Sequence, residues 1–186
     1  INGEPADVVV GKPNMTGGSP TTCNQSSLFR PSGVVIYDGK LIVSERTNRR
    51  VVIFSSVPAS NGALPDIVLG QENFTTCTNN GATDTSLPEP RGVFVNSAGK
   101  LFVTDTTNKR IMIWESIPTH NNQPANVVIG QPDFFSTLSD VSASTFGSLR
   151  QIYATDSRLF VGDNGYNRVL IFNAIPTTSG ASADVI

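Results

Sequence analysis

An acidic residue lies five positions before an arginine three times in this 186-residue chain. The pairs are Glu45 with Arg50, Asp105 with Arg110, and Asp163 with Arg168. A carboxylate and a guanidinium at this spacing can pair across a tight turn, which makes a structural ion pair the favoured interpretation because the feature recurs. The alternative is a ring of carboxylates that binds a cation such as calcium, which needs several converging oxygen ligands.

The polar residues between these charges point to turns. Asn48 and Asn108 follow the acidic residue by three positions. Asparagine tolerates left-handed backbone and bonds neighbouring backbone groups, so both are expected to shape the turn.

Residues for nucleophilic or zinc chemistry are scarce. The chain has one histidine, His120, and it lies in a loop that we expect on the side opposite the acidic turns. A zinc site needs more nitrogen or sulfur ligands than this, and a Ser-His-Asp triad would need the histidine near the acid. No glycine-rich phosphate loop occurs either, so we assign no catalytic residue, no metal ligand and no cofactor.

Two cysteines, Cys23 and Cys77, follow apolar segments that end in Gly11 and Gly70. Both lie in loops that lead into neighbouring repeats on one side of the molecule, which would allow a disulfide between those loops. Two free thiols in a reducing compartment are the alternative, and the spacing does not decide between them.

These residues sit in a repeat of about 59 residues. One apolar segment occurs at Asp7–Gly11, Asp66–Gly70 and Asn126–Gly130, and another at Leu41–Glu45, Leu101–Asp105 and Leu159–Asp163. We place the repeats at 5–63, 64–123 and 124–181, with a further outer strand starting at 182–186.

Each repeat holds short runs of Val, Ile and Phe bounded by turn residues, which predicts four antiparallel strands and an all-β fold. The predicted strands are 33–37, 40–45 and 50–55 in the first repeat; 66–70, 92–96, 100–105 and 110–115 in the second; and 126–130, 151–155, 158–163 and 168–173 in the third. Tight hairpins are expected at Asp38-Gly39 and at Ser97-Ala98-Gly99. Four-stranded repeats that cannot bury both faces alone are typical of β-propeller blades.

The second repeat resembles the NHL repeat in Pro90-Arg-Gly92-Val-Phe-Val, Leu101-Phe-Val-Thr-Asp105 and Asn108-Lys-Arg110-Ile. The first repeat keeps Pro31, Gly33 and Asn48, whereas the third has Leu149, Gln151 and Tyr166 at the Pro, Gly and Asn positions. The resemblance implies a six-bladed propeller, of which this chain would supply three blades. Further repeats of a longer chain, or self-association of two chains, would complete the ring.

Alternating strand direction puts the variable loops 12–28, 71–87 and 131–146 on the same side as the acidic turns. We therefore seek a binding surface for a protein or carbohydrate ligand there. The candidate residues are Arg46, Asn48, Phe74, Asn79, Asn80, Asn108, Phe134, Phe135 and Tyr166. The alternative for the phenylalanines is that they plug the interface between blades.

The net charge of the chain argues against nucleic acid and anionic membranes as partners. The chain has 13 basic and 15 acidic side chains and a net charge of −2, which provides no general electrostatic attraction for nucleic acid or anionic lipid. No run of about 18 apolar residues predicts a membrane-spanning helix. A non-catalytic binding scaffold, extracytoplasmic or secreted, is thus the favoured function. A hydrolase or lyase with a cation in the central channel, and an RNA-binding NHL propeller, are the alternatives.

Overall fold

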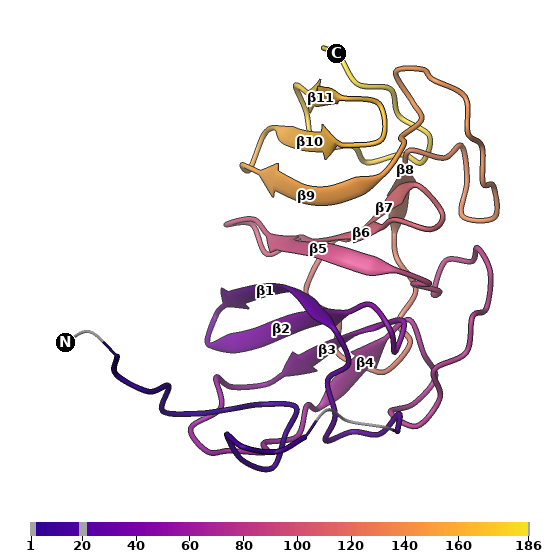
Figure 1. Ribbon diagram of the computed structural model, residues 1–186. Helices are drawn as coiled ribbons and strands as arrows, with labels where there is room; N and C mark the ends of the chain where they lie inside the picture. Colours follow the sequence, from indigo (N-terminus) through magenta and orange to yellow (C-terminus); the bar gives the residue numbers. More distant parts are fainter. Residues whose placement is uncertain (1–2, 19–21, 186) are drawn as a thin grey trace.

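The structure is a computed structural model that describes residues 3–18 and 22–185. Within these ranges all the regular secondary structure is β-strand, and the strands form three antiparallel sheets (Figure 1). The strand orders are β1-β2-β3-β4, β5-β6-β7-β8 and β11-β10-β9. The predicted all-β class is confirmed. None of the described residues belongs to a helix that could cross a membrane.

The strands lie close to the predicted ranges. Their bounds are β1 (Pro31–Tyr37), β2 (Lys40–Glu45), β3 (Arg50–Phe54), β4 (Ile67–Leu69), β5 (Pro90–Val95), β6 (Leu101–Asp105), β7 (Arg110–Trp114), β8 (Val127–Ile129), β9 (Leu149–Ala154), β10 (Leu159–Asp163) and β11 (Arg168–Phe172). The first strand of each sheet starts two residues earlier than predicted. In β1 the cause is a bulge, which lets Pro31 still pair with Glu45 after Gly33 has paired with Ser44.

Positive φ angles occur in the predicted hairpin turn and in the first two acidic turns. Asp38 and Gly39 both have positive φ, at 47° and 70°, as a two-residue hairpin of type I′ requires. In the acidic turns the left-handed residue is Arg49 or Lys109, each with φ of 54°, and not the preceding asparagine. Asn48 and Asn108 shape these turns through their side-chain amides, which donate to the acidic residue three positions earlier.

The sheets stack so that β1, β5 and β9 lie next to one another along one side (Figure 1). Glycine permits this approach. A Cβ on Gly33 would lie 2.5 Å from the carbonyl oxygen of Arg91, and one on Gly92 would lie 2.6 Å from that of Arg150. The hydroxyl of Ser44 donates to the same Arg91 oxygen at 2.6 Å, which joins the first two sheets.

Two apolar cores fill the spaces between sheets. The first contains Ile42, Val51 and Ile53 of the first sheet with Val93 and Val95 of the second. The second packs Phe102, Ile111 and Ile113 against residues of β9, β10 and β11, including Leu149 and Val161. Side chains on the two sides of one strand therefore serve two different cores, as alternation along a strand dictates.

Two sheet faces have no neighbouring sheet. On the first open face, Val34 and Ile36 of β1 are 67% and 60% exposed, whereas the residues one repeat later, Val93 and Val95, are 9% and 7% exposed. On the last open face, Val169 of β11 is 57% exposed, and its equivalents Val51 and Ile111 are fully buried. Tyr153 of β9 is exposed on this same face.

Loops link each outer strand to the next sheet. The backbone amide of Val68 donates to Asn121 at 3.0 Å, and the amide of Asn122 donates to the carbonyl of Val68 at 2.8 Å. The same pair of contacts occurs one repeat earlier and one repeat later. These contacts join Val9 to Asn61 and Gly62, and Val128 to Ser179 and Gly180.

The segment predicted as a further outer strand, 182–186, touches the third sheet. Val185 forms an antiparallel bridge with Ile171, and Asp184 accepts a backbone hydrogen bond from Asn173. Ile186 of this segment, and residues 19–21 of the predicted loop 12–28, lie outside the described residues.

Candidate functional site

The three acid–arginine pairs form as cross-strand partners at the ends of the acidic turns. Glu45 contacts Arg50, and Nε of Arg110 lies 3.0 Å from Asp105, as does Nε of Arg168 from Asp163. Arg50 and Arg110 are among the largest fully buried side chains. Burial raises the pKa of Glu45 and of Asp105, and their arginines and asparagines oppose that rise.

Each buried arginine holds loops together. Arg50 donates through Nη1 to the carbonyl of Phe74 at 2.7 Å and through Nη2 to that of Ser27 at 2.9 Å. Arg110 repeats this with Phe134 and Ser86, at 2.6 Å and 2.9 Å. The guanidinium thus ties the loop that precedes its sheet to the loop that follows it, and this role is structural.

The carboxylates are occupied by these partners. Asn48 donates to Glu45 and Asn108 to Asp105, both at 2.8 Å, while the backbone amide of Gly147 donates to Asp163 at 2.9 Å. Among the described residues there is no group of three His, Cys, Asp or Glu that could hold a metal. The three carboxylates lie apart, each beside its own arginine.

We call the side that carries the variable loops and the acidic turns the loop face. Its predicted binding residues fall into different environments. Asn48 and Asn108 are buried, Phe74 and Phe134 pack against the apolar cores, and Phe135 is 70% exposed.

The remaining candidates are tied to the loops themselves. Asn80 accepts a hydrogen bond from Thr78, and the Tyr166 hydroxyl donates to the carbonyl of Ser139 at 2.6 Å. The Arg168 guanidinium lies 5.2 Å from the centre of the Tyr166 ring, within cation–π range. Arg46 and Asn79 come together in a cavity.

Cys23 and Cys77 form a disulfide, so the bridged alternative is confirmed and the free-thiol alternative is wrong. Their Cα atoms lie 6.3 Å apart, and the bond joins loop 12–28 to loop 71–87. It also fixes the Cys77 carbonyl, which accepts a hydrogen bond from Arg49 at 2.9 Å.

A groove of about 310 Å³ lies where the first sheet meets the second on the loop face. We call it the arginine groove, and it is lined by Arg30, Arg46, Thr47, Arg49, Asn79, Pro88, Glu89 and Thr107. Arg46 donates through Nε and Nη2 to one Glu89 oxygen, at 3.1 Å and 2.5 Å. Arg91 donates to the same oxygen at 2.8 Å. Desolvation alone would raise the pKa of Glu89, but the hydrogen bonds and charges of both arginines outweigh it and lower that pKa.

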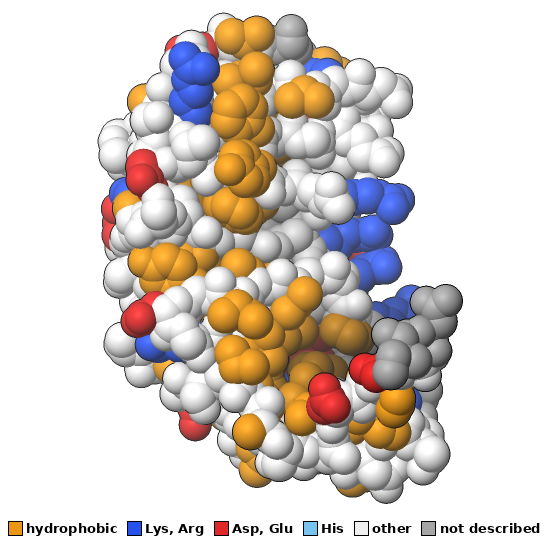
Figure 2. All heavy atoms as spheres, turned by 90° about the vertical axis from the view of Figure 1, so that its left-hand side faces the viewer, with side chains coloured by type: hydrophobic (Ala, Val, Ile, Leu, Met, Phe, Trp, Pro, Cys, Tyr) orange, Lys and Arg blue, Asp and Glu red, His pale blue; other side chains and the backbone are white. Residues whose placement is uncertain are grey.

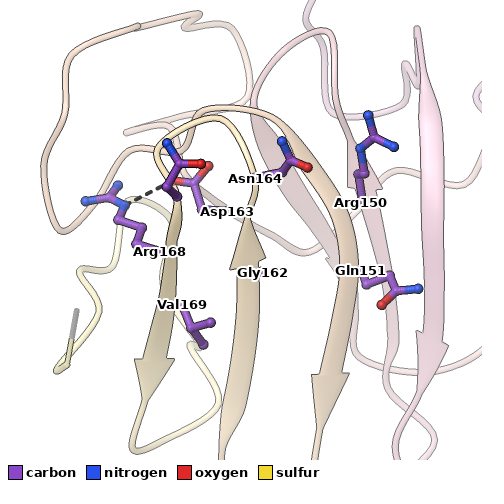
Figure 3. Close-up of a pocket in the computed structure, with 8 residues that line it drawn as sticks. Arg150, Gln151, Gly162, Asp163, Asn164, Arg168 and Val169 are labelled. Atoms are coloured by element: carbon purple, nitrogen blue, oxygen red, sulfur yellow. Dashed lines mark hydrogen bonds and ion pairs between the residues drawn. The ribbon is translucent and has the colours of Figure 1, made fainter.

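A larger cavity, of about 600 Å³, lies on the last open face (Figure 3). Arg150 and Gln151 reach it from β9, and Asp163 and Arg168 close one end with their ion pair. Here Gln151 and Gly162 are cross-strand partners, whereas the matching pair in the first sheet is Gly33 and Ser44. In the first sheet the second strand of this pair carries the side chain, at Ser44, whereas in the third sheet the first strand carries it, at Gln151. The last open face therefore differs from the two faces at which one sheet packs on the next.

Sequence reasoning missed Arg30, Arg49, Glu89 and Thr107 of the arginine groove. A usable signal was present for the charged residues, because Arg30 and Glu89 are equivalent positions of opposite charge. Arg46 and Arg49 correspond to Thr106 and Lys109 one repeat later.

No protein-family model and no curated protein matches this sequence. Among solved structures, selenomethionine-substituted virginiamycin B lyase from Staphylococcus aureus is similar over 76% of this chain and 37% of that chain, with 12% identity and a TM-score of 0.44. The computationally designed Ika4 protein is similar over 85% of this chain and 99% of that chain, with 8% identity and a TM-score of 0.37. A catalytically inactive virginiamycin B lyase from the same organism with quinupristin matches 86% of this chain and 59% of that chain, with 12% identity and a TM-score of 0.36. The chain thus spans less than two thirds of either lyase chain.

Proposed function

We propose that this chain is a binding scaffold of the NHL propeller type. Its loop face binds a ligand, and its two open faces each receive another blade of the same repeat. The acid–Asn–Arg unit, which is built alike in the first two sheets, supports the NHL assignment. The observation that carries the blade proposal is a difference in exposure between equivalent residues. Val34 is exposed on the first open face, whereas its equivalent Val93 is buried between sheets. Val169 is exposed on the last open face, whereas its equivalents Val51 and Ile111 are buried between sheets.

The two open faces suit each other. The residues that the last open face presents, such as Val169, occupy the positions by which the first two sheets contact the sheet that follows. The first open face presents Val34 and Ile36, which occupy the positions that receive such a contact. Figure 2, which looks along the stacked sheets from one side, shows apolar side chains across all three sheets; the open faces lie at the two ends of this stack. Burial of apolar area at about 25 cal/mol per Å² favours joining such surfaces.

In a solution of the 186-residue chain, only a second copy can supply the missing blade. Two copies of three blades joined head to tail would make a ring of six, within the usual range for propellers. We also propose an extracytoplasmic location, which the disulfide supports because such bonds persist in oxidising compartments.

Light scattering with size exclusion tests the blade proposal. We expect an assembly of two copies, and we expect Val34→Lys or Val169→Lys to shift it toward one copy by placing a charge on an open face. Val141→Lys is the matched control, because Val141 is an exposed valine of loop 131–146. A folded single copy for the unaltered chain at all concentrations would overturn the proposal.

A further inference from the structure

The arginines of the arginine groove occur in one repeat alone. The first repeat has Arg30, Arg46 and Arg49, and the equivalent residues are Glu89, Thr106 and Lys109 in the second and Ser148, Asn164 and Asn167 in the third. A structural feature of a repeat recurs, as the buried arginines do. A cluster of three arginines at one junction therefore needs a reason particular to that junction.

Charge in the groove is unbalanced. Three arginines and one carboxylate, Glu89, line it among the described residues, and Glu89 is already engaged by Arg46 and Arg91. Residues 19–21, Ser-Pro-Thr, carry no charged side chain. Nε of Arg91, beside the same carboxylate, is buried and has no hydrogen-bond partner among the residues that the structure describes.

The side chains of Arg46 and Arg49 are held in place before any ligand arrives. Glu89 accepts two hydrogen bonds from Arg46, and the Cys77 carbonyl holds Nη1 of Arg49. The carbonyl of Arg30 accepts the backbone amide of Arg46 at 3.2 Å, which fixes the spacing of these two residues. The disulfide anchors the loop that supplies both Cys77 and Asn79. Such preorganisation lowers the ordering cost of binding.

We propose that the arginine groove binds a carboxylate-rich segment of a protein partner. Guanidinium groups match carboxylates in geometry and charge, and Thr47, Asn79 and Thr107 add neutral hydrogen-bonding groups at the rim. The lining residues include no aromatic ring on which a sugar could stack, which favours an acidic peptide over a saccharide. This inference rests on the proposed binding role of the loop face and is independent of how the ring is completed.

Fluorescence anisotropy of a labelled tetraglutamate peptide with the full chain tests this. We expect saturable binding that weakens as salt rises, and no binding of the tetraglutamine peptide. Arg30→Gln and Arg49→Gln should each weaken binding about tenfold or more, the size expected for a hydrogen bond to a charged group.

Two controls carry the same loss of charge. Lys109→Gln changes the residue equivalent to Arg49 at the next junction, and Arg158→Gln changes an exposed arginine of the β9–β10 turn. Both should bind within about twofold of the unaltered chain. Near-ultraviolet circular dichroism checks that each variant is folded.

Three results would overturn the inference: equal binding of both peptides, equal weakening by Arg158→Gln, or a sulfated disaccharide that binds the groove where tetraglutamate does not. Light scattering of the same samples measures the number of copies in the assembly and so tests the blade proposal separately. A chain that assembles but binds no tetraglutamate contradicts only the ligand, and a single copy that binds it contradicts only the ring.

Discussion

The carbonyl of Phe134 accepts a hydrogen bond from Arg110, whose guanidinium is fully buried between the loops on either side of the second sheet. Phe134 lies in the loop that leads to the third sheet. One side chain therefore connects successive blades through backbone atoms, which do not depend on the sequence of the loop.

Replacing this arginine should be costly. Arg110→Met would leave the Asp105 carboxylate buried without its cation, and we expect the free energy of unfolding to fall by about 3–5 kcal/mol. Urea denaturation measures this. Arg158→Met, on an exposed turn, should change stability by no more than about 0.5 kcal/mol. A loss below about 1 kcal/mol for Arg110→Met would contradict the structural role assigned to the pair.

Substitution by alanine should have different effects on stability at two strand glycines, Gly33 and Gly162. Gly33→Ala would place a Cβ 2.5 Å from the Arg91 carbonyl, so we expect a loss of about 1–3 kcal/mol as the sheets move apart. Gly162→Ala meets nothing closer than 3.7 Å and should be neutral or stabilising by up to about 1 kcal/mol. Thermal unfolding of both variants compares them, and equal effects would contradict the close approach of β1 and β5.

The stability contributed by Glu89 should depend on pH. Arg46 and Arg91 lower the pKa of folded Glu89 below its ordinary value of 4.5, against the effect of desolvation. Its contribution is therefore complete above that value and is lost as pH falls through the lower folded pKa. The unfolding free energy of the unaltered chain minus that of Glu89→Gln should shrink between pH 6 and pH 3. A difference that stays constant or grows on acidification would contradict this.

The disulfide between Cys23 and Cys77 should stabilise the chain by about 4 kcal/mol, because it closes a long loop in the unfolded state. The native protein should show no reactive thiol in a titration, and dithiothreitol should lower its urea midpoint. The double variant Cys23→Ser, Cys77→Ser should have that lower midpoint with or without dithiothreitol. Two reactive thiols in the unreduced protein would contradict the bridge.

The strands could be predicted from the sequence because alternating Val, Ile and Phe, cut by Gly and Asn turns, leave few other structures open. The early start of β1 could not, since pairing of Pro31 with Glu45 needs a bulge that no composition signals. The residue of this turn that takes left-handed backbone, Arg49, has no signal in its residue type, whereas the preceding Asn48 donates its amide to the buried Glu45 carboxylate.

The site was harder to predict than the fold. Arg30, Arg49 and Glu89 reach the arginine groove from three separate segments, and only the packing of the first sheet on the second brings them together. The cysteine spacing was compatible with two redox states, and only the approach of the two loops decides between them.

The contacts of Val9, Val68 and Val128 with the loop of the following sheet have a consequence for cooperativity. Each outer strand receives hydrogen bonds from the sheet ahead of it as well as from its own, so melting any one sheet strips partners from the sheet behind it. Opening of one sheet is therefore penalised at its interface with the neighbouring sheet, and these penalties couple the sheets in series. The three sheets should exchange their amide hydrogens and unfold as one unit.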